Sequence, residues 1–160
     1  MKKNVLLVLA GLVVGILLTV VVMFQAMPKM MLIEDVSRYD FDTTYQVLEK
    51  SIETNNWKMP TVHDLQATMA NFGIDVRPVK VIELCHPGHA GKILRANDER
   101  IVSSLMPCRI AIYEKADGKT YVSRMNSAMM ASMMGGLIKD VMAEAFQENE
   151  LILAPVLGSN

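Results

Sequence analysis

The residues best suited to chemistry are Cys85, His86 and His89, which fall within five consecutive positions, and Cys108, the only other cysteine. Thiolate and imidazole groups bind transition metals, and thiols can also form disulfides. The first three residues follow a predicted strand, and Cys108 begins another. If these strands are antiparallel neighbours, the end of one meets the start of the other at the same sheet edge. The sequence therefore predicts that Cys85 and Cys108 lie close together.

Three states are open to Cys85 and Cys108: a disulfide, a thiolate metal site, or two separate buried thiols. Disulfides persist outside the cytosol, so an extracytoplasmic domain with two cysteines favours a structural disulfide. Cα atoms more than about 7 Å apart would exclude that bond.

A metal or haem site is the alternative, because cysteine and histidine together suit zinc, copper or haem iron. We expect Cys85, His86, His89 and Cys108 to line it, with His63, the only other histidine, as a further candidate. The spacing matches neither a zinc finger nor the C-x-x-C-H motif of covalent haem attachment. Exposed loop histidines that bind nothing remain the default interpretation of His86 and His89.

Methionine is unusually frequent, with 14 in the chain and a Met-Met-x-x-Met-Met pattern in its last third. Thioethers select Cu(I), so one interpretation is a copper-binding surface. Methionine also fills irregular gaps in a core and forms adaptable contact faces, which is the favoured interpretation. The candidate copper ligands are Met129, Met130, Met133 and Met134.

Motifs of several enzyme classes are absent: there is no G-x-S-x-G elbow, no phosphate-binding glycine loop and no H-E-x-x-H. His63 and Asp64 could orient a base beside Cys85. Capping of the following helix explains Asp64 without catalysis. The sequence favours a protein that is not an enzyme and leaves that question open.

Periodicity predicts a single α+β domain over residues 31–157, after a linker at 25–30 and before a tail at 158–160. Asp117-Gly118 is typical of a β-hairpin, and Gly135-Gly136 should interrupt a methionine-rich helix. The domain should have two layers, with helices packed on one face of a mostly antiparallel sheet. The expected strands are 31–37, 57–63, 79–85, 108–115, 119–125 and 151–157, and the expected helices 41–55, 64–72, 87–95, 98–105 and 126–147.

A membrane anchor is predicted from Val5 to Phe24, a run of 20 residues without a charge. As an α-helix it would extend about 30 Å, the thickness of a bilayer's hydrocarbon core. A cleaved signal peptide is the competing interpretation, but its apolar region is shorter and ends in small residues, whereas Phe24 is bulky. Lys2 and Lys3 should hold residues 1–4 in the cytoplasm and place the domain outside it, on the periplasmic side of the inner membrane in a Gram-negative source.

The expected partners are the membrane and a second copy of the chain. Gly11 and Gly15 share one helix face, a spacing that lets two membrane helices approach closely, so a homodimer is a hypothesis. Glycine is nevertheless frequent in membrane helices in general. Residues 30–160 carry 13 basic and 17 acidic side chains, a formal charge of −4, so we expect no nucleic-acid partner.

The chain also contains a set of short motifs: His63-Asp64, Val81 to Pro87, Leu105 to Ile110, Asp117-Gly118 and Asn126. Together they resemble the domain of unknown function 302 family over approximately residues 31–157. The resemblance implies a compact α+β domain that often dimerises, and it implies no established activity. The chain departs from the family pattern where His86 replaces an asparagine and where His89-Ala90-Gly91 replaces a Gly-Thr step.

Two functions from different classes follow. The first is a membrane-anchored extracytoplasmic module that binds a small ligand, a soft metal or haem, and that is accessory to a redox system. The second is a non-catalytic interaction or dimerisation module in which Cys85 and Cys108 form a structural disulfide and the methionine helix contacts a partner.

Overall fold

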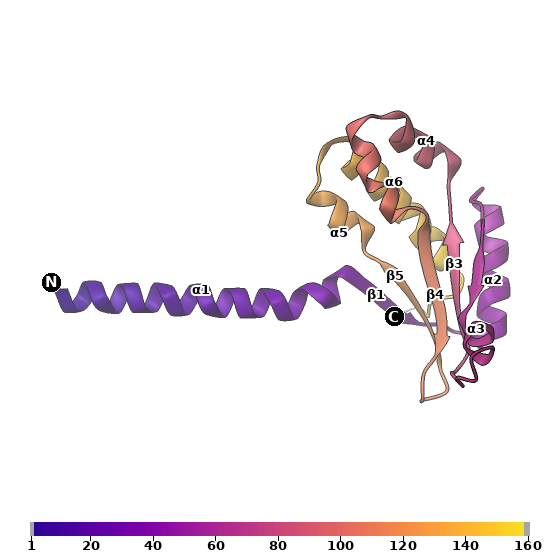
Figure 1. Cartoon of the computed structure of the whole chain (residues 1–160), viewed down its shortest axis with the longest axis horizontal. Helices are drawn as coiled ribbons and strands as arrows, with labels where there is room; N and C mark the ends of the chain where they lie inside the picture. Colours follow the sequence, from indigo (N-terminus) through magenta and orange to yellow (C-terminus); the bar gives the residue numbers. More distant parts are fainter. Residues whose placement is uncertain (1, 159–160) are drawn as a thin grey trace.

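The computed structural model describes the backbone of residues 2–158, without the side chains of residues 2, 3, 5–10, 28 and 29. An α+β domain lies at the end of a long N-terminal helix, α1 (Lys2–Met31), as Figure 1 shows. The predicted cytoplasmic residues 1–4 and the predicted tail 158–160 fall partly outside the described residues.

The domain is built on a five-stranded sheet in the order β1-β5-β4-β3-β2, and every neighbouring pair is antiparallel. This confirms the predicted α+β class. The hairpin between β4 and β5 turns at Gly118, whose φ of 74° is readily adopted only by glycine. The strands are β1 (Leu32–Val36), β2 (Val62–Asp64), β3 (Val79–Leu84), β4 (Cys108–Glu114) and β5 (Thr120–Met125).

Several of the helices begin at a side chain that accepts a backbone N–H. Asp40 accepts from Thr43, Asp64 from Ala67, and Asn126 from Met129. Each cap satisfies one of the amide groups that the first helical turn leaves without a partner. The helices of the domain are α2 (Phe41–Thr54), α3 (Leu65–Ala70), α4 (Pro87–Arg95), the 3₁₀ helix η1 (Asp98–Leu105), α5 (Ser127–Ser132) and α6 (Gly136–Leu153).

The hydrophobic core lies between one face of the sheet and the helices α2 and α6. Ile82 pairs with Ile110, and the next inward position of β4, Ile112, pairs with Val122. These side chains are almost fully buried, since alternate residues of a strand point to the same face. The helices contribute Leu48, Ile52, Ile152 and Leu153 to the same cluster.

The segment 25–30, predicted as a linker, is helical, because α1 continues to Met31 and β1 begins at the next residue. Gln25, Ala26 and Met27 are compatible with a helix, so the helix extends past the apolar run. Within the part of the chain that the structure describes, no helix combines the length and apolar character needed to cross a bilayer. The predicted anchor includes residues 5–10, whose side chains lie outside the described ones.

Two predicted strands also differ from the structure. Most of 57–63 is irregular, with only a single bridge between Lys58 and Cys85, since Pro60 cannot donate to a ladder. Leu151 to Leu153 extend α6, and only an isolated bridge joins Leu157 to Ser37. The predicted interruption at Gly135-Gly136 is confirmed as the break between α5 and α6.

Candidate metal-binding site

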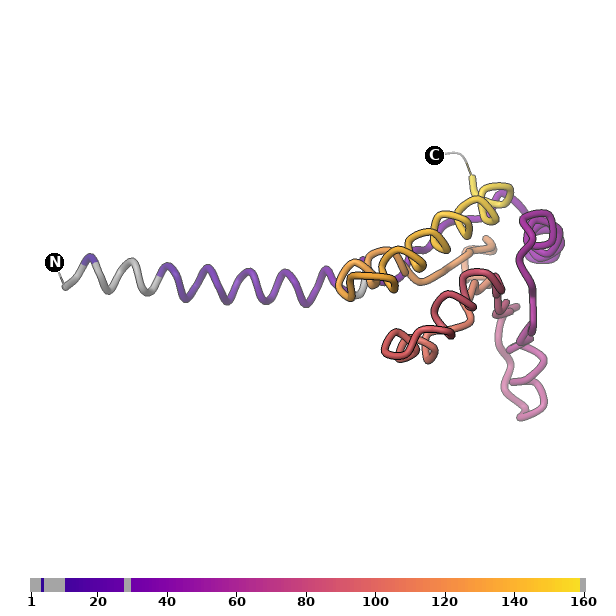
Figure 2. Tube along the Cα trace, turned by 90° about the horizontal axis from the view of Figure 1, so that it is seen from above, coloured from indigo at the N-terminus to yellow at the C-terminus, as the bar shows by residue number. Residues whose placement is uncertain are grey.

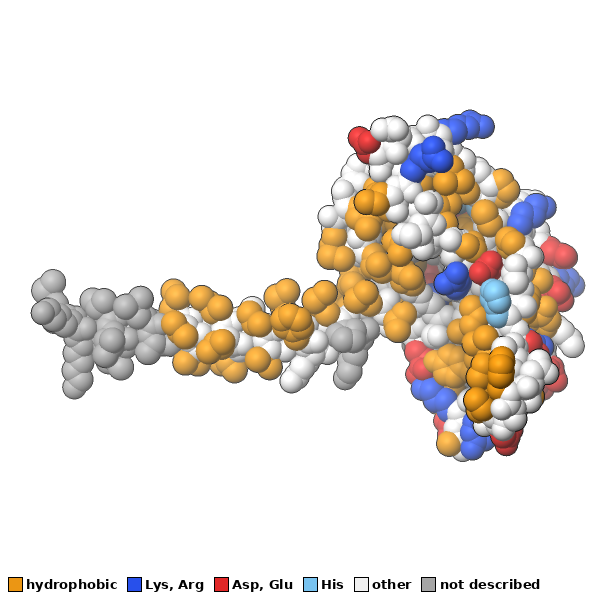
Figure 3. All heavy atoms as spheres, viewed as in Figure 1, with side chains coloured by type: hydrophobic (Ala, Val, Ile, Leu, Met, Phe, Trp, Pro, Cys, Tyr) orange, Lys and Arg blue, Asp and Glu red, His pale blue; other side chains and the backbone are white. Residues whose placement is uncertain are grey.

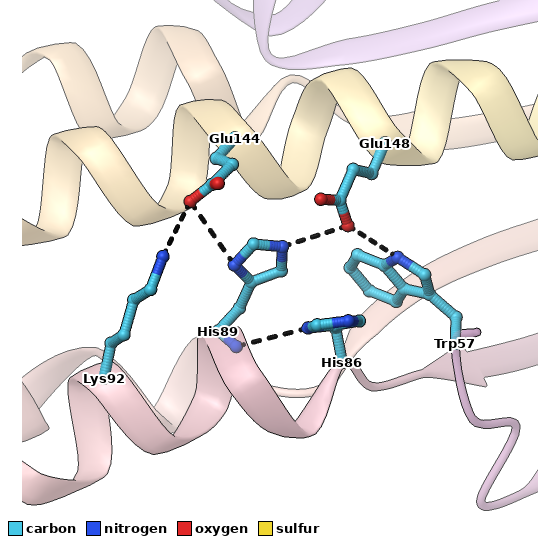
Figure 4. Close-up of polar contacts among 6 residues, drawn as sticks. All are labelled: Trp57, His86, His89, Lys92, Glu144 and Glu148. Atoms are coloured by element: carbon cyan, nitrogen blue, oxygen red, sulfur yellow. Dashed lines mark hydrogen bonds and ion pairs between the residues drawn. The ribbon is translucent and has the colours of Figure 1, made fainter. Parts of the chain in front are cut away.

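The candidate site lies where the start of α4 faces the middle of α6 (Figure 4). After β3 ends at Leu84, His86 occupies the cap of α4 and Pro87 its first helical position. Proline suits that position, because the amide hydrogen that it lacks would have no helical partner there. His86 and His89 therefore lie at the first turn of α4, and both rings lie beside α6 and Trp57 (Figure 4).

Glu148 of α6 receives the central hydrogen bonds of the site. His89 Nε2 lies 3.0 Å from Glu148 Oε2, and Trp57 Nε1–H donates to the same oxygen at 2.8 Å. The rings of His86 and His89 pack with their centroids 4.5 Å apart, and Trp57 packs against both. His89 is only 8% exposed, so these contacts are shielded from water.

The other ring nitrogen of His89 faces Glu144, one helical turn before Glu148. Nδ1 of His89 lies 3.6 Å from Glu144 Oε2, which also accepts a hydrogen bond from Lys92 Nζ at 2.9 Å. The 3.6 Å separation is too long for a hydrogen bond, so His89 Nδ1 is buried without a partner among the described atoms. A buried polar nitrogen in this position indicates a site that can tighten around an additional group.

The carboxylate of Glu148 is held in its ionised form. Burial by itself would raise the pKa of Glu148, but hydrogen bonds from His89 and Trp57, together with the charges of His89 and His86, lower it overall. Glu144 also has a lowered pKa, mainly because Lys92 donates a hydrogen bond to it and carries a positive charge. An ionised carboxylate beside two imidazoles is a donor set suited to a transition metal.

The geometry brings these donors within reach of one ion. One ligand atom from each of His86, His89 and Glu148 lies within 4.8 Å of the other two. His86 and His89 come from the start of α4 and Glu148 comes from α6, so a bound metal would join the two helices. Small side-chain movements would bring the donors to metal-ligand separation, since a tetrahedral zinc site places them about 3.3 Å apart.

A small apolar pocket adjoins the two histidines of the donor set. Its volume is about 60 Å³, and Cys85, Cys108 and Met142 lie in its wall with both histidines. Pockets for small organic ligands usually begin at about 300 Å³. The pocket can thus hold an ion or a few-atom ligand, and it does not fit haem.

Both cysteines are free thiols, so the expected disulfide is not formed. In the sheet register Cys108 is paired with Leu84, so Cys85 is not directly opposite it. Burial raises the pKa of Cys108, a hydrogen bond from Asn149 offsets part of this, and negative charge on Cys85 adds to it. The thiolate is the nucleophilic form, so the raised pKa also argues against a catalytic role for Cys108.

The remaining predicted ligands lie elsewhere. His63 is on the edge strand β2, where its Nε2 lies 3.1 Å from Glu83 Oε1, and Asp64 caps α3 as expected. His63 is not part of the three-donor cluster, because β2 pairs with β3 at the end remote from α4. The methionine-rich segment is separated from the site too: Met133 and Met134 are exposed and Met129 and Met130 half-buried, and none of the four lines the pocket.

Sequence reasoning missed Glu148, Glu144 and Trp57. Glu144 and Glu148 are four residues apart on α6, a spacing that places both on one helix face. That spacing was visible in the sequence, but nothing local indicates that this face meets α4. Trp57 was assigned to a strand, whereas its buried side chain anchors an irregular segment against the site.

Comparison with known proteins gives a family and a fold. Residues 33–154 match the family described as Domain of unknown function DUF302. A similar solved structure is that of an uncharacterized conserved protein DUF302 from Bacillus stearothermophilus. The match has a TM-score of 0.70 and 20% sequence identity, and it covers 78% of this chain and 97% of the Bacillus chain. No curated protein matches the chain. The matched residues begin just after α1 ends, so the long helix precedes the family domain.

Proposed function

Because the chain belongs to the DUF302 family, whose description assigns no activity, we propose a function from the site itself: a module that binds one transition-metal ion, zinc or copper, through His86, His89 and Glu148. The observation that carries the proposal is the convergence of these three donors from two helices. The role is binding or delivery of the metal, since the described residues of the site contribute three ligands.

The donor set favours a metal of intermediate softness. Two imidazoles and one carboxylate are a frequent zinc set, and imidazole also suits copper. Metal-ligating histidines usually present their second nitrogen to a carboxylate, which fixes the ring and increases its basicity. Glu144 occupies that position for His89, and Lys92 holds Glu144 in place.

The neighbouring pocket supports a metal in preference to an organic ligand. Its volume of about 60 Å³ leaves space for a water molecule or a small anion next to an ion bound by the histidines. Cys85 and Cys108 lie in the same wall and provide thiols close to the ion, which supports a role accessory to redox chemistry.

The proposal includes an anchor in a membrane, with the domain on the extracytoplasmic side. Its support is the run of 20 uncharged residues from Val5 to Phe24 and the two lysines that precede it. In spheroplasts, protease added from outside should digest the domain. Resistance to the protease until the membrane is lysed would contradict the proposed orientation.

Metal binding is tested on the full chain in detergent micelles. We expect one zinc or copper ion per chain after dialysis, measured by elemental analysis. Replacement Glu148→Gln should weaken binding by more than the about 10–100-fold that loss of an outer hydrogen-bond partner of a ligand costs. His86→Asn should have a similar effect, and Cys85→Ser shows whether the thiol contributes.

His63→Asn is the matched control, because it removes an exposed histidine that lies outside the three-donor cluster. It should bind metal as the wild type does. Equal affinity in wild type and Glu148→Gln would overturn the proposal. If the wild type and Glu148→Gln bound copper(I) equally well, the exposed methionines would be the binding site instead.

A further inference from the structure

A second distinctive surface surrounds the junction between α1 and the domain. From Met125 to Ile138 the chain has 14 consecutive residues without a charge, although 21% of the whole sequence is charged. This stretch forms the end of β5, all of α5 and the start of α6. With the end of α1 and the start of β1 it presents exposed apolar side chains, which we call the junction patch: Met30, Leu32, Met125, Met133, Met134 and Leu137.

The exposure of these side chains is large for apolar residues of a folded domain. Met133 is 69% exposed, Leu32 is 62% exposed and Met30 is 54% exposed. A contiguous exposed apolar area of this kind usually marks an interaction surface. The stretch from Met125 to Ile138, which supplies most of the patch, carries no charged side chain. The patch is therefore suited to an apolar medium more than to a charged partner.

The junction patch is held in a fixed position relative to α1. The backbone N–H of Asn126 donates to the carbonyl of Met31 at 2.8 Å, and its side-chain amide donates to the carbonyl of Met30 at 3.2 Å. These bonds satisfy two carbonyls at the end of α1 that have no helical partner. Leu32 is paired with Met125 in the sheet, so the end of α1 and the start of α5 are fastened at two consecutive positions.

The position of α5 is the decisive feature. In Figures 1 and 2 it lies on the side of the domain from which α1 projects, next to the last turns of that helix, and α5 contacts α1 directly. Figure 3 shows hydrophobic side chains continuing from α1 onto the adjoining side of the domain. If Val5 to Phe24 cross the hydrocarbon core, the turns that follow lie at the level of the lipid headgroups, and α5 lies at that level too.

We propose that the junction patch lies in the interfacial layer of the same membrane that α1 enters, with Met133 and Met134 among the lipid headgroups and upper acyl chains. This inference rests on the anchor of the proposed function. The occupant is the bilayer surface, because the patch is continuous with the anchor helix. Amphipathic segments at such surfaces bury their apolar side about 5–10 Å into the headgroup and acyl boundary.

The test uses the full chain in phosphatidylcholine liposomes and the fact that Trp57 is the only tryptophan. Met133→Trp adds an indole to the junction patch. Phe72→Trp is the matched control, because Phe72 is 74% exposed and follows α3, on the far side of the domain from α1 (Figures 1 and 2). Trp57 itself is buried, so the emission of each variant above that of the wild type reports the new indole.

Lipids brominated in the upper acyl chain should abolish most of the added emission of Met133→Trp and leave that of Phe72→Trp unchanged. Aqueous iodide should do the reverse. Quenching of Met133→Trp by iodide and not by brominated lipid would overturn the inference. Protection from both quenchers would mean that protein, such as a second copy of the chain, covers the patch, and would overturn it as well.

Flotation of the same liposomes separates this inference from the anchor on which it rests. A chain that does not float with the lipid refutes both the anchor and the position of the patch. A chain that floats, while Met133→Trp stays insensitive to brominated lipid, refutes only the position of the patch.

Discussion

His89 presents each of its two ring nitrogens to a different carboxylate, Glu148 on one side and Glu144 on the other. The ring is buried, so its orientation is determined by these neighbours and by Trp57. The arrangement leaves one nitrogen hydrogen-bonded and the other without a hydrogen-bond partner among the described atoms. The two carboxylates orient the ring before any ion binds. If a metal bound Nε2, Glu144 would be in position to hold Nδ1.

Glu148 should stabilise the metal-free fold, with a dependence on pH that follows from its lowered pKa. Its ionised form contributes stability above the ordinary value of 4.5, and this contribution is lost as the pH falls through the lower native pKa. We expect Glu148→Gln to cost about 1 kcal/mol near neutral pH, at the low end for a hydrogen-bond partner because the Glu148 side chain is 35% exposed.

Thermal unfolding without metal, followed by circular dichroism, checks this prediction. The difference between wild type and Glu148→Gln should shrink below pH 4.5. Glu53→Gln, which alters an exposed carboxylate of α2, is the control and should change little. A difference that is constant across the whole pH range would contradict the assignment.

Cys108 should react slowly with alkylating reagents, because burial raises its pKa above the ordinary 9.0. At neutral pH the thiolate fraction is then smaller than in an unperturbed cysteine. Iodoacetamide labelling followed by mass spectrometry should show Cys108 modified more slowly than a small free thiol, with a rate that increases as the pH rises past 9.0. Labelling at neutral pH as fast as that of a free thiol would show that the group is not buried as described.

At this scale the sequence predicts only the part of the site that is local. Cys85, His86 and His89 could be selected because they are close together along the chain. Glu148 is 59 residues from His89, and its contact depends on how α6 lies across α4. No spacing rule connects such distant positions, so the carboxylate that completes the donor set was missed.

At the scale of elements, Arg124 connects three parts of the fold. From β5 it donates to Asp35 of β1 and to Glu150 of α6, and its side chain is only 7% exposed. Burial by itself lowers the pKa of Arg124, but the hydrogen bonds that it donates to Glu150 and Asp35 raise it overall. The guanidinium therefore remains charged and holds α6 against the sheet edge.

Arg124→Met should destabilise the domain by about 2 kcal/mol, because two carboxylates lose their buried cation. The cost is below that of a fully buried pair, since Asp35 and Glu150 are about one-third exposed. Urea unfolding measures it. Arg109→Met is the matched control on neighbouring β4: its side chain is 62% exposed, and its ion pair with Glu83 should contribute little.

Element types were easier to predict than element ends. The strands near 79–85, 108–115 and 119–125 are confirmed because β-branched residues and a strong Asp-Gly turn define them locally. The strands predicted at 57–63 and 151–157 are mostly wrong: in the first only Val62 and His63 join the sheet, and the second begins as the end of α6. Apolar residues of both segments are nevertheless buried in the core. Periodicity reports burial, and only tertiary contacts decide whether a buried segment is a strand.

For the whole molecule, metal binding should appear as added stability. A ligand that binds only the folded state, present at 100 times its Kd, stabilises that state by about 2.7 kcal/mol. We expect zinc at this excess to raise the melting temperature of the wild type and of His63→Asn. Calorimetry should show no comparable increase for Glu148→Gln, and an equal increase in that variant would exclude the three-donor site.

The passage from α1 into β1 without a loop determines how the domain is presented. A domain on a flexible tether samples many orientations, whereas this domain must rotate together with α1. Each residue inserted into the helix would rotate the metal-binding face by about 100° around the helix axis and shift it by about 1.5 Å along that axis. A protein that exchanges metal with this site would therefore have to approach from one direction around the axis of α1 and at one height along that axis.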